Sequence, residues 1–257
     1  MLALLVAMTL PALAHDFVLE VEPATVEVGG QAKVYGVVAT GTERATRMQR
    51  LASLTRLDGW VGGAAVAIDE PRSFRGPPPH WGYAPTEAAG VVPLAYTNSG
   101  AEVSLAHEKF VTYVRDEGDD RMVEVAKGLS GEQKEHYRRS LKALLRVGEA
   151  STGWDAVVGL PLELVPQADP FARPASGELA LKLVADGTPV EGVKVRAFPM
   201  GGHAENDVVV GRTDAEGNVT LAMPATDGGW VVAAVTMSHE AGREQPWHSL
   251  WTSLRLP

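Results

Sequence analysis

The chain has 257 residues, no cysteine and a formal net charge of −9. Its apolar fraction of 45% and charged fraction of 21% are those of a globular protein and exclude a disordered one. Without cysteine there are no disulfides or thiolate metal sites, so any metal must be held by His, carboxylate, Met or backbone groups. The negative charge argues against nucleic acid and anionic membrane surfaces as partners.

The first 14 residues predict an export signal. They are uncharged and mostly apolar, and they end in Ala12-Leu13-Ala14, an A-x-A signal-peptidase pattern. We therefore expect cleavage before His15 and a periplasmic mature protein that does not span a membrane, because no later stretch approaches about 18 apolar residues. This start carries no Lys or Arg, which leaves open a true start upstream of Met1.

Alternating apolar residues predict strands through most of residues 15–150. The pattern is clear within residues 17–38, short and weak within 51–57 and 64–68, and present again within 91–96 and 102–105. Residues 71–90 are rich in Pro and Gly and predict a loop, which contains Trp81 and Tyr83.

Two helices are expected between residues 107 and 147. The first is short and amphipathic, from His107 to Glu117. The second follows a capping box at Ser130, with apolar residues spaced at i, i+4, i+7 and i+8 and Gly148 at its end. His136 would then be a solvated histidine on the surface of this second helix.

From residue 151 to 257 the pattern returns to short strands separated by turns, which is typical of a small sandwich. The sequence therefore predicts a mainly β fold with two β-sandwich domains of Ig-like or prealbumin-like type. Residues 15–150 form the first, with the helical segment 107–147, and residues 151–257 form the second.

Cleavage before His15 would give this residue an unusual chemistry. Its free α-amine and its imidazole Nδ1 can chelate one ion together, and a second imidazole can complete a set of three nitrogens. Tetragonal nitrogen ligation suits Cu(II) or Ni(II). We therefore predict a transition-metal site at the mature N-terminus.

Other histidines are candidates for the second ligand. His239 follows one predicted strand and His248 precedes the last one, so both belong at one end of the C-terminal sandwich, where loops gather. His107 begins the first predicted helix. His203 follows Met200-Gly201-Gly202, a combination that could take copper, whereas His80 stands among prolines beside Trp81 and is expected to pack or cap a loop.

Familiar catalytic patterns are absent from the sequence. There is no G-x-S-x-G elbow, no H-E-x-x-H helix and no P-loop. The segment Asp214–Asn218 lacks the alternating oxygen ligands of a calcium loop and predicts a turn. We therefore do not expect an enzyme.

Several motifs together resemble the DUF4198 family of exported bacterial proteins. They are Ala14-His15-Asp16-Phe17, Lys142-Ala143-Leu144-Leu145-Arg146-Val147-Gly148, Gly159-Leu160-Pro161-Leu162-Glu163 and Ser249-Leu250-Trp251-Thr252. The resemblance implies a periplasmic component of nickel or cobalt uptake that presents metal to an inner-membrane transporter. The Thr-Asp-x-x-Gly hairpin from Thr213 to Gly217 also resembles carboxypeptidase-regulatory-like or transthyretin-like modules. The family often carries a histidine where this chain has Thr236, and His239 follows three residues later.

The leading hypothesis is thus a metal-binding protein that uses His15, with His239 as the first choice of second ligand and His107 and His248 in reserve. The metal is Ni, Co or Cu. Two alternatives remain. One is a copper-dependent oxidative enzyme with a substrate surface around Trp81 and Tyr83, and the other is a metal-free β-sandwich module for binding or adhesion.

Overall fold

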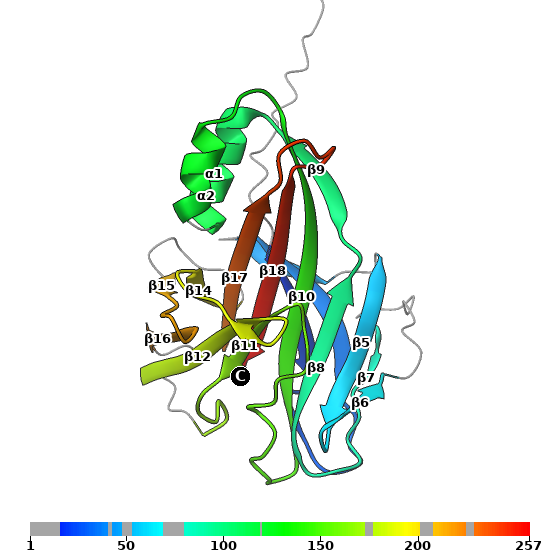
Figure 1. Cartoon of the computed structure of the whole chain (residues 1–257). Coiled ribbons are helices and arrows are strands. Elements are labelled where there is room, and N and C mark those ends of the chain that lie inside the picture. Colours follow the sequence, from blue (N-terminus) through cyan, green and yellow to red (C-terminus); the bar gives the residue numbers. More distant parts are fainter. Residues whose placement is uncertain are drawn as a thin grey trace, which may run out of the picture.

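A computed structural model shows the expected mainly β fold, with several sheets and two short helices (Figure 1). It describes residues 16–40, 43–47, 53–68, 80–118, 120–172, 177–200, 208–224 and 229–257. His15 and His203, and the loop residues 71–79, lie outside these ranges. None of the described helices is long and apolar enough to cross a membrane.

The largest sheet has ten strands, and a single long strand, β10 (Gln133–Val147), lies at its centre. β10 pairs in parallel with β18 (Trp247–Leu256) on one side. On the other side it pairs antiparallel with β8 (Gly90–Asn98) and β9 (Ala101–Leu105). The remaining strands extend this sheet outward: β2 (Thr25–Val26), β5 (Leu54–Val61), β6 (Ala64–Ala67), β14 (Lys194–Pro199), β15 (Val209–Arg212) and β17 (Trp230–His239).

Two small sheets pack on opposite faces of the ten-stranded sheet. The N-terminal one contains β1 (Asp16–Glu22), β3 (Lys33–Thr40), β4 (Glu43–Arg47) and β7 (Gly82–Tyr83). The other contains β11 (Leu162–Pro166), β12 (Gly177–Ala185), β13 (Thr188–Pro189) and β16 (Asn218–Met223). Figure 1 shows β11 and β12 in front of the large sheet and the blue N-terminal strands behind it.

The alternation of side chains along β10 explains this layering. Leu141, Ala143 and Leu145 face the N-terminal sheet and share a core with its residues. Leu144 points the other way and joins the core formed with β11, β12 and β16. We call these two sides of the ten-stranded sheet the N-terminal face and the C-terminal face.

The predicted helix after Ser130 is wrong, because this segment is β10. Residues 140–145 are all buried, and an apolar run that is buried on both sides fits a helical spacing as well as a strand. The capping box does not form: the Gln133 side-chain amide donates to the Ser130 and Gly131 carbonyls instead. His136 is therefore on a sheet, and the helical segment ends well before residue 147.

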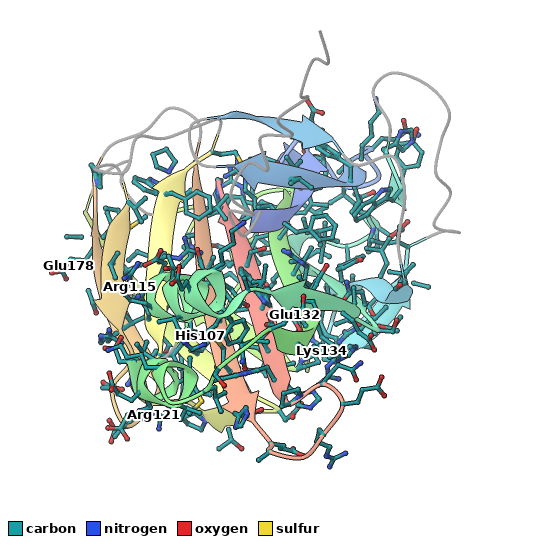
Figure 2. The ribbon with its side chains drawn as sticks, turned by 90° about the horizontal axis from the view of Figure 1, so that it is seen from above. His107, Arg115, Arg121, Glu132, Lys134 and Glu178 are labelled. Carbon is teal, nitrogen blue, oxygen red and sulfur yellow. The ribbon has the colours of Figure 1, made fainter. Side chains whose placement is uncertain are left out.

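The first predicted helix is confirmed as α1 (His107–Glu117), and a second helix, α2 (Asp120–Lys127), follows it. Together they cover one end of the N-terminal face, where Phe110, Val114, Val123 and Ala126 bury the ring of Trp247. Figure 2 looks onto this end and shows Arg115 on α1 and Arg121 on α2. The Lys194 amine donates to the Arg115 carbonyl at 2.7 Å, which ties the end of α1 to β14.

The predicted domain boundary near residue 150 falls in the connection between β10 and β11. Strands from both sides of this boundary share the ten-stranded sheet, since β8 and β10 precede it and β14, β17 and β18 follow it. The division into two domains stays a prediction.

A buried ion pair connects the central strand to the sheet on the C-terminal face. The Lys142 amine lies 2.6 Å from a Glu163 carboxylate oxygen, and both side chains are 0% exposed. The Glu163 carboxylate also accepts backbone N–H groups of Val158, Gly159 and Leu160, at 2.9 to 3.2 Å. Burial lowers the pKa of Lys142, and the neighbouring Glu163 opposes this shift.

We expect Lys142→Met to lower the free energy of unfolding by about 3–5 kcal/mol, because it leaves a buried carboxylate without its cation. Lys127→Met is the matched control, since Lys127 pairs with Glu124 on an exposed helix face and should cost no more than about 1 kcal/mol. Urea denaturation measures both. If both variants lost the same free energy of unfolding, the buried pair would not hold the sheets together.

Candidate functional site

The three predicted second ligands for His15 do not all lie on one face of the ten-stranded sheet. His239 and Trp247 are register partners on β17 and β18, and their ring centroids lie 4.7 Å apart. His248 is the next residue along β18, so it points to the opposite face of the sheet. Within the described ranges, no group of three or more His, Asp or Glu side chains is arranged to hold a metal ion.

The N-terminal face carries β1, His239 and His107. His107 begins α1, one turn before Phe110, whose ring lies 4.8 Å from that of Trp247. Its buried Nδ1 has no hydrogen-bond partner among the described residues. The start of β1 is anchored on the same face, where the Ser253 hydroxyl donates to the Phe17 carbonyl at 2.9 Å.

The substrate surface predicted around Trp81 and Tyr83 for an oxidative enzyme is not formed by both side chains. Trp81 is 0% exposed, and its ring stacks on Tyr96 and meets the edge of Phe17. Tyr83 is 38% exposed. Trp81 is therefore part of the core beneath the N-terminal sheet rather than a platform for a substrate.

A carboxylate is buried beneath α1 on the N-terminal face. Glu135 of β10 is 1% exposed and accepts a hydrogen bond from the Tyr113 hydroxyl of α1 at 2.8 Å. It also accepts one from the Ser249 hydroxyl, which in turn accepts the Trp251 indole N–H at 3.0 Å. Burial raises the pKa of Glu135, while the two hydroxyl donors act in the opposite direction.

The C-terminal face holds a pair of histidines that the sequence did not reveal. His136 and His248 are register partners on the parallel strands β10 and β18, and their ring centroids lie 6.3 Å apart. The helical spacing after Ser130 predicted that His136 lies on a helix, which hid this relation. Once residues 133–147 are read as a strand, its partner depends on the pairing of distant segments, which no local pattern encodes.

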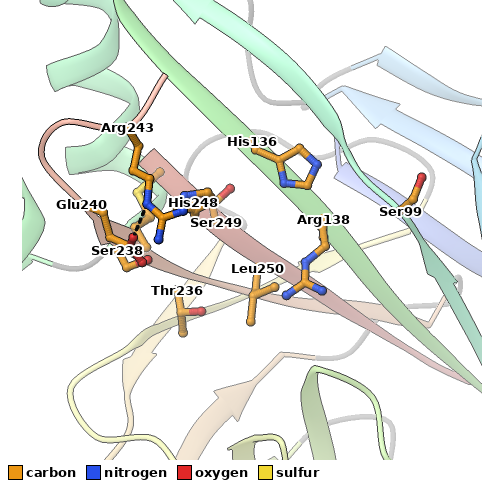
Figure 3. A pocket seen from close by; sticks show the side chains of 11 residues that line it. Ser99, His136, Arg138, Thr236, Ser238, Glu240, Arg243, His248, Ser249 and Leu250 are labelled. Atoms are coloured by element: carbon orange, nitrogen blue, oxygen red, sulfur yellow. Dashed lines mark ion pairs between the residues drawn. The ribbon is translucent and has the colours of Figure 1, made fainter. Parts of the chain in front are cut away.

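These two imidazoles line an open pocket of about 590 Å³ (Figure 3). Arg138 of β10 and Leu250 of β18 continue the two strands beside them, and Thr236 and Ser238 of β17 add hydroxyl groups. Arg243 and Glu240 close one end, with the Arg243 guanidinium 2.9 Å from the Glu240 carboxylate. Two imidazoles and two guanidinium groups therefore line one pocket.

These features define a mainly β protein whose central sheet is sandwiched between two smaller ones. Residues 12–238 match the family model described as "Domain of unknown function (DUF4198)", and the chain belongs to this family. The match includes His15, His107 and His136, whereas His239 and His248 lie beyond it.

The other comparisons add little. No match was found among curated proteins. A solved structure, the "D00-D0 domain of Intimin", is similar at 14% identity over 94% of this chain and 100% of its own length, with a TM-score of 0.21. A superposition this poor supports no argument about function.

Glu135→Gln should stabilise the protein at neutral pH. Because burial raises the pKa of Glu135 above 4.5, the folded state binds this proton more tightly than the unfolded state. The contribution of Glu135 to stability is therefore greatest below the pKa that this residue has in the unfolded chain. It decreases as pH rises through the higher pKa of Glu135 in the folded protein. Glutamine cannot ionise and still offers an oxygen to Tyr113 and Ser249. It should therefore remove the loss of stability that ionisation of Glu135 causes at higher pH.

Thermal unfolding between pH 4 and pH 8 measures this effect. Each kcal/mol gained should raise Tm by about 2–4 °C. Glu108→Gln, on the exposed side of α1, is the control and should follow the unmodified protein. A lower Tm for Glu135→Gln at pH 8 would show that the ionised carboxylate stabilises the fold.

Proposed function

We propose that this is an exported, periplasmic protein that binds a transition metal for an uptake or homeostasis system and is not itself an enzyme. The metal is Ni, Co or Cu, and His15 binds it through its free amine and imidazole after signal cleavage. The partner that receives the metal is an inner-membrane transporter. The nickel or cobalt role and the transthyretin-like character of the C-terminal half, both implied by the family resemblance, belong to this proposal.

The observation that supports the proposal most directly is the position of β1. This strand begins at Asp16, the residue that follows His15. It pairs with β3 along its whole length, beginning with the register pair Asp16 and Ala39. Phe17 is 8% exposed and packs against Tyr96 at a centroid distance of 5.4 Å. Cleavage after Ala14 would therefore leave the chelating residue next to a firmly anchored strand, which reduces the entropy lost on binding.

The second ligand on this face is His239 or His107. The rise of a strand puts about 20 Å between Ser253, which contacts Phe17, and Trp247, which lies beside His239. His239 therefore shares an ion with His15 only if the chain end extends along the sheet toward the helices. His248 points away from this face and belongs to the pocket with His136.

The test is isothermal titration with Ni(II), Co(II) and Cu(II). The protein that starts at His15 is compared with its His15→Gln variant, which keeps the free α-amine and removes the imidazole. We expect this change to weaken binding at the N-terminal site by at least about tenfold, or 1.4 kcal/mol. Binding should also weaken as pH falls through about 8 to 6, because the ion displaces protons from the amine and the imidazole.

Equal affinities of the two forms would remove His15 from the site. Within the protein that starts at His15, His239→Gln and His107→Gln then identify the second ligand. Absence of metal binding in both forms would favour the metal-free binding module instead.

A further inference from the structure

The imidazoles of His136 and His248 are close enough for one metal ion to contact both. A metal–nitrogen bond of about 2.1 Å puts a ring centre about 3.2 Å from the ion, so two rings on one ion have centres no more than about 6.4 Å apart. The observed separation of 6.3 Å lies within this limit.

The backbone makes room for the His136 ring. Gly100 has a φ of +95°, and a Cβ atom at this position would lie 2.6 Å from His136 Nε2 and 2.5 Å from the Tyr137 carbonyl oxygen. Only glycine fits here, both because of this close approach and because of the left-handed backbone. The turn between β8 and β9 therefore lies directly against the Nε2 edge of the His136 imidazole and fixes the position of this ring.

The rest of the pocket does not suit a bare metal ion. It supplies two imidazoles, and no third His, Asp or Glu joins them in a ligand cluster among the described residues. Arg138 and Arg243 also line the pocket, and their positive charges oppose a cation. A volume of about 590 Å³ is also far larger than one ion requires, since a water molecule in the liquid takes up about 30 Å³.

The same groups fit a metal ion that arrives with an organic ligand. A chelating polycarboxylate that surrounds the ion leaves free carboxylate oxygens and an overall negative charge. Planar guanidinium groups bind carboxylates through paired hydrogen bonds, and Arg138 has no ion-pair partner among the described residues. The hydroxyls of Thr236 and Ser238 add further donors on the β17 side.

We propose that the His136–His248 pocket binds a transition-metal ion as its complex with a small polycarboxylate. The two imidazoles fill the coordination positions that the chelator leaves open, and Arg138 holds the carboxylates. This inference rests on the proposed role in metal handling and names the form in which the metal is bound. The pocket is on the other face of the sheet from β1 and can therefore be tested separately from His15.

The experiment uses the full mature chain with His15→Gln, which removes the His15 imidazole and with it the N-terminal chelate. Titration calorimetry compares three probes: Cu(II) alone, the Cu(II)–nitrilotriacetate complex and free nitrilotriacetate. We expect the complex to bind at least tenfold more tightly than either Cu(II) or the free chelator. Electron paramagnetic resonance of the bound complex should report imidazole nitrogen on the copper.

Four variants assign the contacts. His136→Gln and His248→Gln should each weaken binding of the complex at least tenfold and remove the imidazole signal. Arg138→Gln should weaken binding of the complex while the imidazole signal of any residual bound complex persists. Arg115→Gln, on the exposed side of α1 and outside the pocket, is the matched control and should change nothing, and thermal unfolding confirms that every variant is folded.

Three results would overturn the proposal. They are binding of Cu(II) alone as tight as that of the complex, binding of free nitrilotriacetate as tight as that of the complex, and no binding of the complex by the folded protein. Each leaves the His15 proposal standing, because that site is absent from the His15→Gln form. Loss of metal binding in the His15→Gln form, with binding of the complex unchanged, would confirm the two sites separately.

Discussion

The ion pair between Lys142 and Glu163 determines how the layers of this protein fit together. It joins the middle of the central strand to the sheet on the C-terminal face, with both charges fully buried. A buried charge is costly unless its hydrogen bonds are satisfied, and here Glu163 accepts from three backbone N–H groups as well as from Lys142. The chain after β10 is therefore fixed where it crosses the C-terminal face.

This arrangement also decides where the C-terminal face stays open. Leu144 and Lys142 of β10 lie beneath β11 and the core around it. Arg138 and His136 lie nearer the N-terminal end of the same strand. The small sheet does not extend that far, and the uncovered end of the face becomes the pocket. The two helices cover the corresponding end of the N-terminal face by packing on Trp247. The two faces therefore differ in the groups that they hold at this end. One holds the buried Glu135, and the other holds an open pair of imidazoles.

Much of the fold could be predicted from the sequence because its strands alternate clearly and end in turn residues. The helix α1 was also predictable from the spacing of Phe110, Tyr113 and Val114. The strand β10 was not, since its apolar residues are buried on both faces and a run of this kind has no distinct period. The true pattern is alternate packing of Leu141, Ala143 and Leu145 against one core and Leu144 against the other.

The same limit applies to the candidate site. Chemistry alone singled out His15, because signal cleavage creates its special position, and it drew attention to His248. It could not pair His248 with His136, since their contact depends on parallel pairing between β10 and β18, which are far apart in the chain. It also could not separate His239 from His248, because which face each histidine occupies depends on the register of β17 against β18.

X-ray absorption spectroscopy of the mature protein, loaded with the metal it retains through purification, tests histidine-based metal binding most directly. If a histidine binds the metal, the first coordination shell contains nitrogen and oxygen and shows the multiple-scattering pattern of at least one imidazole. A shell made only of oxygen, or protein that retains no metal after growth in Ni-, Co- and Cu-supplemented medium, would contradict histidine-based metal binding as its function.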